Sequence, residues 1–218
     1  TIVSAVRHGR GVYDNIRRFI LYILASNVAE VAPFITMLLL RIPAALSVLQ
    51  ILAVDLGTDL LPALGLGAEP PQTDVMNRPP RRRDQPLLDR SLLQQAYLFL
   101  GLLEGVLAML GYGLTWWSEG IGLPALRALA PALLQHQASA ELLLIQHQAS
   151  AVALGSIVFA QAGTALACRG QRLLAPNGLL LLGIAVELIA FVVLQGWPPL
   201  ARTFQMAAIP SQFWWWLL

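Results

Sequence analysis

Acidic side chains stand in stretches of the sequence that are otherwise apolar. There are five of them, and each lies well away from the polar parts of the chain: Glu30, Asp55, Asp59, Glu104 and Glu187. If these stretches cross a membrane, an ionised carboxylate at mid-bilayer costs about 2.5–3.5 kcal/mol. Three on neighbouring helices would cost about 8–10 kcal/mol before any partner helps. Such acids must carry protons, bind a cation, or both.

The spacing of three of these acids indicates a shared site. Asp55 and Asp59 are four residues apart and lie on one face of a helix, with Thr58 beside them. Asn27 and Glu30 are three residues apart and also share a face. Carboxylate, amide and hydroxyl oxygens suit alkali and alkaline-earth cations or protons.

Two prolines strengthen this hypothesis. Pro33 lacks the N–H that would bond to the carbonyl of Ala29, and Pro62 does the same for Thr58. Freed carbonyls in a membrane span persist where they line a cavity or coordinate a ligand. The competing interpretation is a set of packing kinks with protonated acids, and we favour the cation site because intramembrane acids are usually functional.

Other polar residues in the apolar stretches leave the choice open. Glu104 and Glu187 suit a protonated structural role as well as an ion-binding one. Gln161 could be a weaker cation ligand or a hydrogen bond between helices, and we favour the second.

The elements that must position these residues are membrane-spanning helices. The chain has 218 residues, of which 57% are hydrophobic and 12% charged, against about 25% charged in soluble domains. We predict an all-α, polytopic transmembrane bundle with about five full spans and the start of a sixth. The five spans are 14–40, 46–67, 92–117, 149–167 and 178–195, and QFWWWLL at the end would open the sixth. By region, 1–68 would hold an entry stalk and the first hairpin with half of the cation site, 69–91 a proline- and arginine-rich loop, and 92–218 the remaining helices.

The arginines predict the orientation of the bundle. All 14 basic residues are arginines, and a net charge of +2 gives no reason to expect a nucleic-acid partner. Eleven of them fall on one side of the predicted spans if the loop 69–91 lies there, and only Arg41, Arg127 and Arg202 fall on the other. The positive-inside rule therefore places the loop in the cytoplasm, with lipid around the helices.

A short repeat precedes the fourth predicted span. QHQASA occurs at 135–140 and again at 146–151, which places His136 and His147 at matching positions. A metal site usually needs three or four ligands, and no cysteine or carboxylate cluster accompanies the histidines. We therefore expect a duplication in a loop on the outer side that tolerates insertions.

Two long stretches resemble the P-type cation-transporting ATPases, in the branch of the calcium and the sodium/potassium pumps. They are GRGVYDNIRRFILYILASNVAEVAPF and QILAVDLGTDLLPALGLGAEPPQTDVMNRPPR, with looser similarity at AYLFLGLLEG and FAQAGTALACR. The resemblance implies that the spans match the family's fifth to ninth transmembrane helices. It implies cation ligands at Asn27, Glu30, Asp55, Thr58 and Asp59, with a weaker contribution from Gln161.

The resemblance also implies which branch and which parts of the pump are involved. An acid at position 55 resembles the sodium/potassium branch. Ser26 stands where gastric proton pumps have lysine, which argues against that subtype. Thr164 stands where sodium pumps have an aspartate, which argues against a third sodium site. The phosphorylation motif DKTG, the TGES motif and the fourth helix of the family do not occur in this sequence, which also opens without methionine.

We therefore expect the membrane domain of an ATP-driven cation pump. ATP and magnesium would be needed by the intact pump, and no cofactor by this chain, which alone should not hydrolyse ATP. Its partners would be the N-terminal pump domains and a transported calcium, sodium, potassium or proton, and its location the plasma (inner) membrane. The alternatives are a stand-alone remnant or accessory membrane protein without transport, and a small proton-coupled carrier, for which no inverted repeat is visible.

Overall fold

The computed structural model describes residues 1–55, 59–80, 86–135, 137–170 and 177–217. Within these residues all regular structure is helical, as predicted. The longest elements are α1 (Ile2–Leu40), α5 (Gly101–Ser118), α7 (Ala140–Ala167) and α8 (Gly178–Gly196). The shorter ones are α2 (Val48–Val54), α3 (Leu60–Gly67), α4 (Arg90–Gln94), the π-helix η2 (Gln95–Leu100), α6 (Leu123–Leu134), α9 (Pro198–Thr203), the 3-10 helix η3 (Ser211–Phe213) and α10 (Trp214–Leu217).

Four helical stretches in the described part of the chain are long and apolar enough to cross a membrane. They are Ile2–Leu40, Arg90–Ser118, Ala140–Ala167 and Gly178–Gly196. The predicted span 46–67 contains α2 and α3, and residues 56–58 between Asp55 and Asp59 lie outside the described part. The predicted sixth span stays a prediction, because its residues form only η3 and the four-residue α10, which packs against α7.

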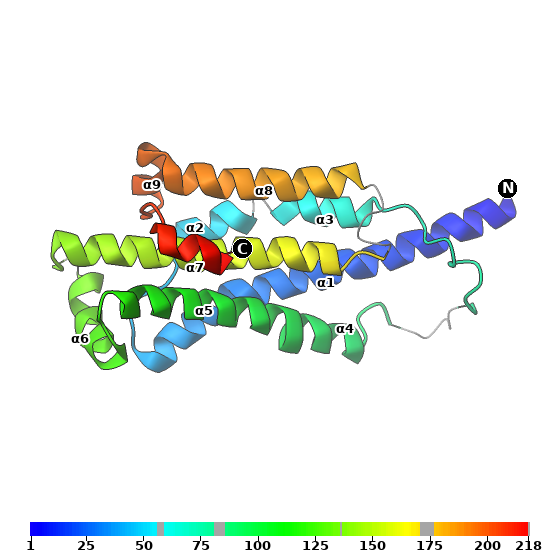
Figure 1. The fold of residues 1–218 in the computed structure, drawn as a ribbon. Helices are drawn as coiled ribbons and strands as arrows, with labels where there is room; N and C mark the ends of the chain where they lie inside the picture. The colour runs from blue at the N-terminus through cyan, green and yellow to red at the C-terminus, as the bar shows by residue number, and fades with distance from the viewer. Residues whose placement is uncertain (56–58, 81–85, 136, 171–176, 218) are drawn as a thin grey trace.

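The helices lie side by side in one elongated bundle (Figure 1). α7 occupies the middle and contacts α1, α3, α5 and α8, while α1 also packs along α5. The N-terminus and the segment that follows α3 lie at one end, which we call the loop end, and α6 and α9 lie at the other, the α6 end (Figure 1). The long helices α1, α5, α7 and α8 therefore run lengthwise between these two ends (Figure 1).

Close contact between α3 and α8 depends on two glycines. A Cβ at Gly65 would lie 2.5 Å from the Cα of Leu180, and one at Gly183 would lie 2.7 Å from the backbone nitrogen of Pro62. A side chain at either position would meet backbone, which cannot move aside as a flexible side chain can. The two contacts fix the register of α8 against the helix that begins beside Asp59.

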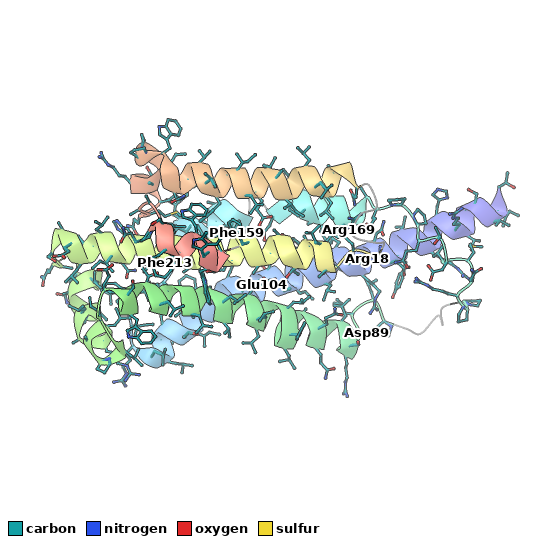
Figure 2. All side chains as sticks on the ribbon, viewed as in Figure 1. Arg18, Asp89, Glu104, Phe159, Arg169 and Phe213 are labelled. Atoms are coloured by element: carbon teal, nitrogen blue, oxygen red, sulfur yellow. The ribbon has the colours of Figure 1, made fainter. Side chains whose placement is uncertain are left out.

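A network of buried charges ties the loop end together. Glu69 follows α3, and its carboxylate pairs with Arg169 at 3.0 Å and with Arg18 at 3.2 Å. The side chains of Glu69 and Arg169 are each 1% exposed. Asn15 on α1 also donates to the backbone carbonyls of Gly67 and Glu69. The network joins α1, the segment after α3 and the end of α7, and Figure 2 shows Arg18 and Arg169 at this end.

The start of α4 is held by Asp89, whose side chain accepts the backbone N–H of Leu92 at 2.8 Å. Asp89 also accepts a hydrogen bond from Arg17 on α1, at 2.8 Å. The Leu92 N–H and then the Arg17 guanidinium hold the pKa of the Asp89 carboxyl below its ordinary value.

One prediction about the α6 end is wrong, and one helix there was not predicted. α7 begins at Ala140 and not at 149, so the second QHQASA copy lies inside a helix and not in a loop. Its polar side chains bond to the turn after α1: Gln146 donates to the carbonyl of Ala44 at 2.7 Å, and Ser150 to that of Ala45 at 2.8 Å. The helix α6 was also not predicted, and its 12 residues are too short to span a bilayer.

Candidate cation site

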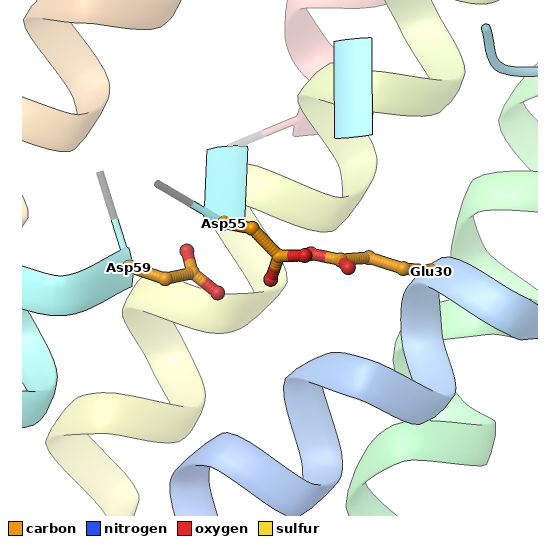
Figure 3. Close-up of side chains that lie close together, drawn as sticks. All are labelled: Glu30, Asp55 and Asp59. Atoms are coloured by element: carbon orange, nitrogen blue, oxygen red, sulfur yellow. The ribbon is translucent and has the colours of Figure 1, made fainter. Parts of the chain in front are cut away.

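Three of the predicted carboxylates meet in the interior of the bundle. Each of Glu30, Asp55 and Asp59 offers an oxygen that lies within 4.8 Å of the oxygens offered by the other two. Glu30 is on α1, Asp55 directly follows α2 and Asp59 directly precedes α3. Figure 3 shows the three side chains converging, with the Glu30 and Asp55 carboxyl groups in contact.

The hydrogen bonds of this group leave acceptor oxygens free. The carboxyl groups of Glu30 and Asp55 lie side by side, and two carboxyl groups can share a hydrogen bond only when one of them carries a proton. Asp59 accepts from the hydroxyl of Ser26 and, at 3.1 Å, from the amide of Gln161. One oxygen of Glu30 and one of Asp59 are buried without a hydrogen-bond partner.

Cationic side chains do not neutralise this group in the described part of the chain. The ion pairs found there involve Asp14, Glu69, Asp74 and Asp89, all near the loop end. Glu30 and Asp59 are 4% and 2% exposed, so water cannot screen their charges either. Such a set of oxygens is stable with protons or with a bound cation.

The other predicted site residues are placed differently. Gln161 is fully buried on α7 and donates to both Ser26 and Asp59, which is the helix-to-helix hydrogen bonding that we favoured for it. The side chain of Asn27 is exposed on α1, whereas Glu30 on the same helix is buried. Thr58 lies outside the described residues.

Ser26 belongs to this group, and the sequence analysis did not propose it as a site residue. It lies one turn before Glu30 on the same buried face of α1. Its hydroxyl donates to Asp59 and accepts from Gln161, so it joins α1, α3 and α7. The four-residue spacing from Glu30 made Ser26 a candidate, but the same spacing argument applies to Asn27, which is three residues from Glu30.

The two prolines do not interrupt the described helices. α1 continues through Pro33 from Ile2 to Leu40, and Pro62 lies in the first turn of α3. A proline in a first turn removes no hydrogen bond within that helix. The prediction that the carbonyls of Ala29 and Thr58 lack their helical hydrogen bonds stays a prediction, and Thr58 lies outside the described residues.

Comparison with known proteins points to one family. The family described as "Cation transporting ATPase, C-terminus" matches residues 43–218. The endoplasmic reticulum calcium ATPase srcA of Aspergillus fumigatus is 44% identical over 117 residues, which cover 54% of this chain and 12% of that protein. The human potassium-transporting ATPase alpha chain 2 is 36% identical over 121 residues, or 55% of this chain and 12% of that protein.

A third relative belongs to the sodium/potassium pumps. The sodium/potassium-transporting ATPase subunit alpha-4 of Rattus norvegicus is 37% identical over 113 residues, which cover 51% of this chain. The matched region spans only 11–12% of the length of these relatives. Because the family match covers most of the helical bundle, the chain belongs to the P-type cation-transporting ATPases and represents their C-terminal transmembrane region.

Proposed function

We propose that this bundle binds the cation that an ATP-driven pump moves across the membrane, with Glu30, Asp55 and Asp59 as its carboxylate ligands. The observation that carries the proposal is their convergence from three helical segments, with two buried oxygens left unbonded. Binding a cation offsets the cost of placing three acids in a bilayer. Acids that only formed structural hydrogen bonds would have no reason to converge on one place. Thr58 completes the ligands between the two aspartates.

Asn27 and Gln161 contribute in different ways in this proposal. Gln161 holds Asp59 from α7 and is a weaker ligand. The amide of Asn27 faces outward on a helix whose neighbouring exposed residues, Val31 and Ile35, are apolar. An amide facing lipid is unfavourable, so we infer that a further membrane segment covers it and completes the site. In this family that segment is the fourth helix.

The pump as a whole needs parts that lie outside this sequence. ATP and magnesium would act on the N-terminal domains, and phosphorylation there would expose the carboxylates to each side of the membrane in turn. The named relatives transport calcium, potassium, or sodium and potassium, and we propose one of these cations or the proton as the cargo. We propose the plasma (inner) membrane as the location, with residues 69–91 in the cytoplasm.

Asp59→Asn in the intact pump tests the site. The substitution keeps the shape of the side chain, so the bundle should fold, while ion-activated phosphorylation is lost. Asp55→Asn should weaken activation less, because calcium pumps of the family have an amide there. Glu141→Gln is the control, since Glu141 is exposed at the start of α7. Normal ion-activated phosphorylation in Asp59→Asn protein would show that the cation binds elsewhere.

A further inference from the structure

Glu104 is a buried acid that the proposed cation site does not use. It lies on α5 with 1% of its surface exposed, in the interior of the bundle (Figure 2). One carboxyl oxygen accepts the hydroxyl of Thr164 on α7, and the other is buried without a hydrogen-bond partner. A single neutral hydroxyl compensates little of the cost of burying a charge.

The depth of Glu104 is set by the glycines on either side of it. A Cβ at Gly101 would lie 2.6 Å from the carbonyl oxygen of Ala25, and one at Gly105 would lie 2.6 Å from the Cβ of Ala32. α5 thus presses directly on the part of α1 that carries Ser26 and Glu30. Glu104 therefore lies at the depth of the cation site, about 20 Å along the helix from its start at Arg90.

The titratable groups around Glu104 are acids, a phenol and a thiol, which are either neutral or negatively charged. When ionised they disfavour a negative charge on the Glu104 carboxyl group, and when neutral they do not compensate one. They come from every neighbouring helix: Tyr22 and Glu30 on α1, Asp59 beside α3, Cys168 at the end of α7 and Glu187 on α8. The arginines whose ion pairs the structure gives are paired with carboxylates at the loop end. Each ionised neighbour would repel a second negative charge in this low-dielectric interior.

We propose that Glu104, hydrogen-bonded to Thr164, is a proton-binding site of the bundle, separate from the carboxylates of the cation site. Its ligand is a proton, because one carboxyl group and one hydroxyl provide too few oxygens to coordinate a metal cation. The site is not isolated. Thr164 lies one turn from Gln161, which bonds to Asp59, so α7 connects the two sites.

This inference deepens the proposed function by adding a second ion, and it rests on that function only for its physiological meaning. The proton itself can be detected in the chain alone. A cation entering the neighbouring site would favour release of the Glu104 proton, since the positive charge stabilises the carboxylate.

Infrared spectroscopy of the chain in lipid nanodiscs at neutral pH tests the proposal. A protonated carboxyl group has a C=O stretching band that a carboxylate lacks. Glu104→Gln should remove one such band, whereas Glu141→Gln should remove none, because Glu141 is exposed to water. Thr164→Val should shift the same band to that of a free carboxyl group, and Thr164→Ser should restore it. Transfer to D2O should shift the band in the folded protein, because a binding site exchanges its proton with the solvent.

Each outcome decides the matter. If Glu104→Gln leaves the bands unchanged, Glu104 is ionised and the proposal is wrong. If the Glu104 band stays unshifted in D2O until the protein unfolds, the proton does not exchange with the solvent in the folded protein. Its role is then structural, and the proposal is also wrong. Should Glu104→Gln fail to fold, the Thr164 variants and the exchange in D2O still decide. None of these measurements detects cation binding at Asp59, so failure here is distinguishable from failure of the proposed cation site.

Discussion

Individual carboxylates in this bundle have one of two kinds of neighbour, depending on their depth. Glu69 lies at the loop end and is enclosed by Arg18 and Arg169. Glu30 and Asp59 lie deep in the bundle and have hydroxyl, amide and carboxyl neighbours. A carboxylate with arginine partners is already neutralised and needs no ligand, while the deep acids need protons or a cation. The same side chain is structural in one place and a candidate for ion binding in the other.

The structural role of Glu69 leads to a prediction about stability. Glu69→Gln removes the carboxylate that pairs with the buried guanidinium of Arg169, and we expect a loss of about 3–5 kcal/mol in the free energy of unfolding. Asp74→Asn is the matched control, because the Asp74–Arg78 pair is roughly half exposed and should contribute about 1 kcal/mol or less. Denaturant unfolding in mixed micelles measures both variants. Equal losses would show that the network contributes no more than a surface pair.

The three carboxylates of the candidate site could be identified from the sequence, but their neighbours could not all be identified. The cost of an acid in a membrane does not depend on fold details, so Glu30, Asp55 and Asp59 were informative by themselves. Helical spacing allows either Ser26 or Asn27 to lie beside Glu30, because both are within one turn of it. The packing of α7 against α1 decides that Ser26 is buried there. Helical periodicity does not contain that information.

At the scale of the helices, the apolar stretches could be predicted and the polar contacts between them could not. Spans at Arg90–Ser118 and Gly178–Gly196 agree with the prediction to within two residues at most. The first turns of α7 were assigned to a loop because the QHQASA repeat was interpreted as a duplication that a loop tolerates. In the bundle those polar groups satisfy backbone carbonyls of the turn after α1. A polar segment that bonds to another part of the chain cannot be told from a solvated loop by composition.

The contact between α3 and α8 leads to a prediction for a single methyl group. Gly183→Ala places a Cβ against the backbone of Leu61 and Pro62, and overpacking of this kind costs about 1–3 kcal/mol. The helices would have to separate beside Asp59, so ion activation of the intact pump should weaken as well.

Gly163→Ala on α7 is the control for this prediction. A Cβ there has no neighbour within 4 Å, and alanine favours a helix by about 0.5–1 kcal/mol over glycine. Thermal unfolding in detergent measures both variants. The proposed close packing is wrong if the two alanine variants are equally stable.

At the scale of the whole molecule, the two ends of the bundle differ in charge and in structure. The loop end has the buried network around Glu69 and the stretch that precedes Asp89, while the α6 end has the short helices α6 and α9 (Figure 1). Seven of the eleven arginines predicted on the cytoplasmic side lie in the described part of the chain, and they belong to segments that meet at the loop end. The structure thus gathers at one end those described arginines that the positive-inside rule assigns to the cytoplasm.

This asymmetry predicts which side of the membrane each end faces. Thr73 is exposed in the segment after α3, and Gln135 is exposed directly after α6. Single cysteines at these two positions, in a Cys168→Ser background, should react with a membrane-impermeant reagent from opposite sides, Thr73→Cys from the cytoplasmic side. The parent protein is the control, because its one cysteine, Cys168, is buried and should not react. The helices between the two positions cross the membrane an odd number of times if the bundle spans it as proposed. Labelling of both cysteines from the same side would contradict that crossing, and labelling of Thr73→Cys from outside alone would invert the orientation.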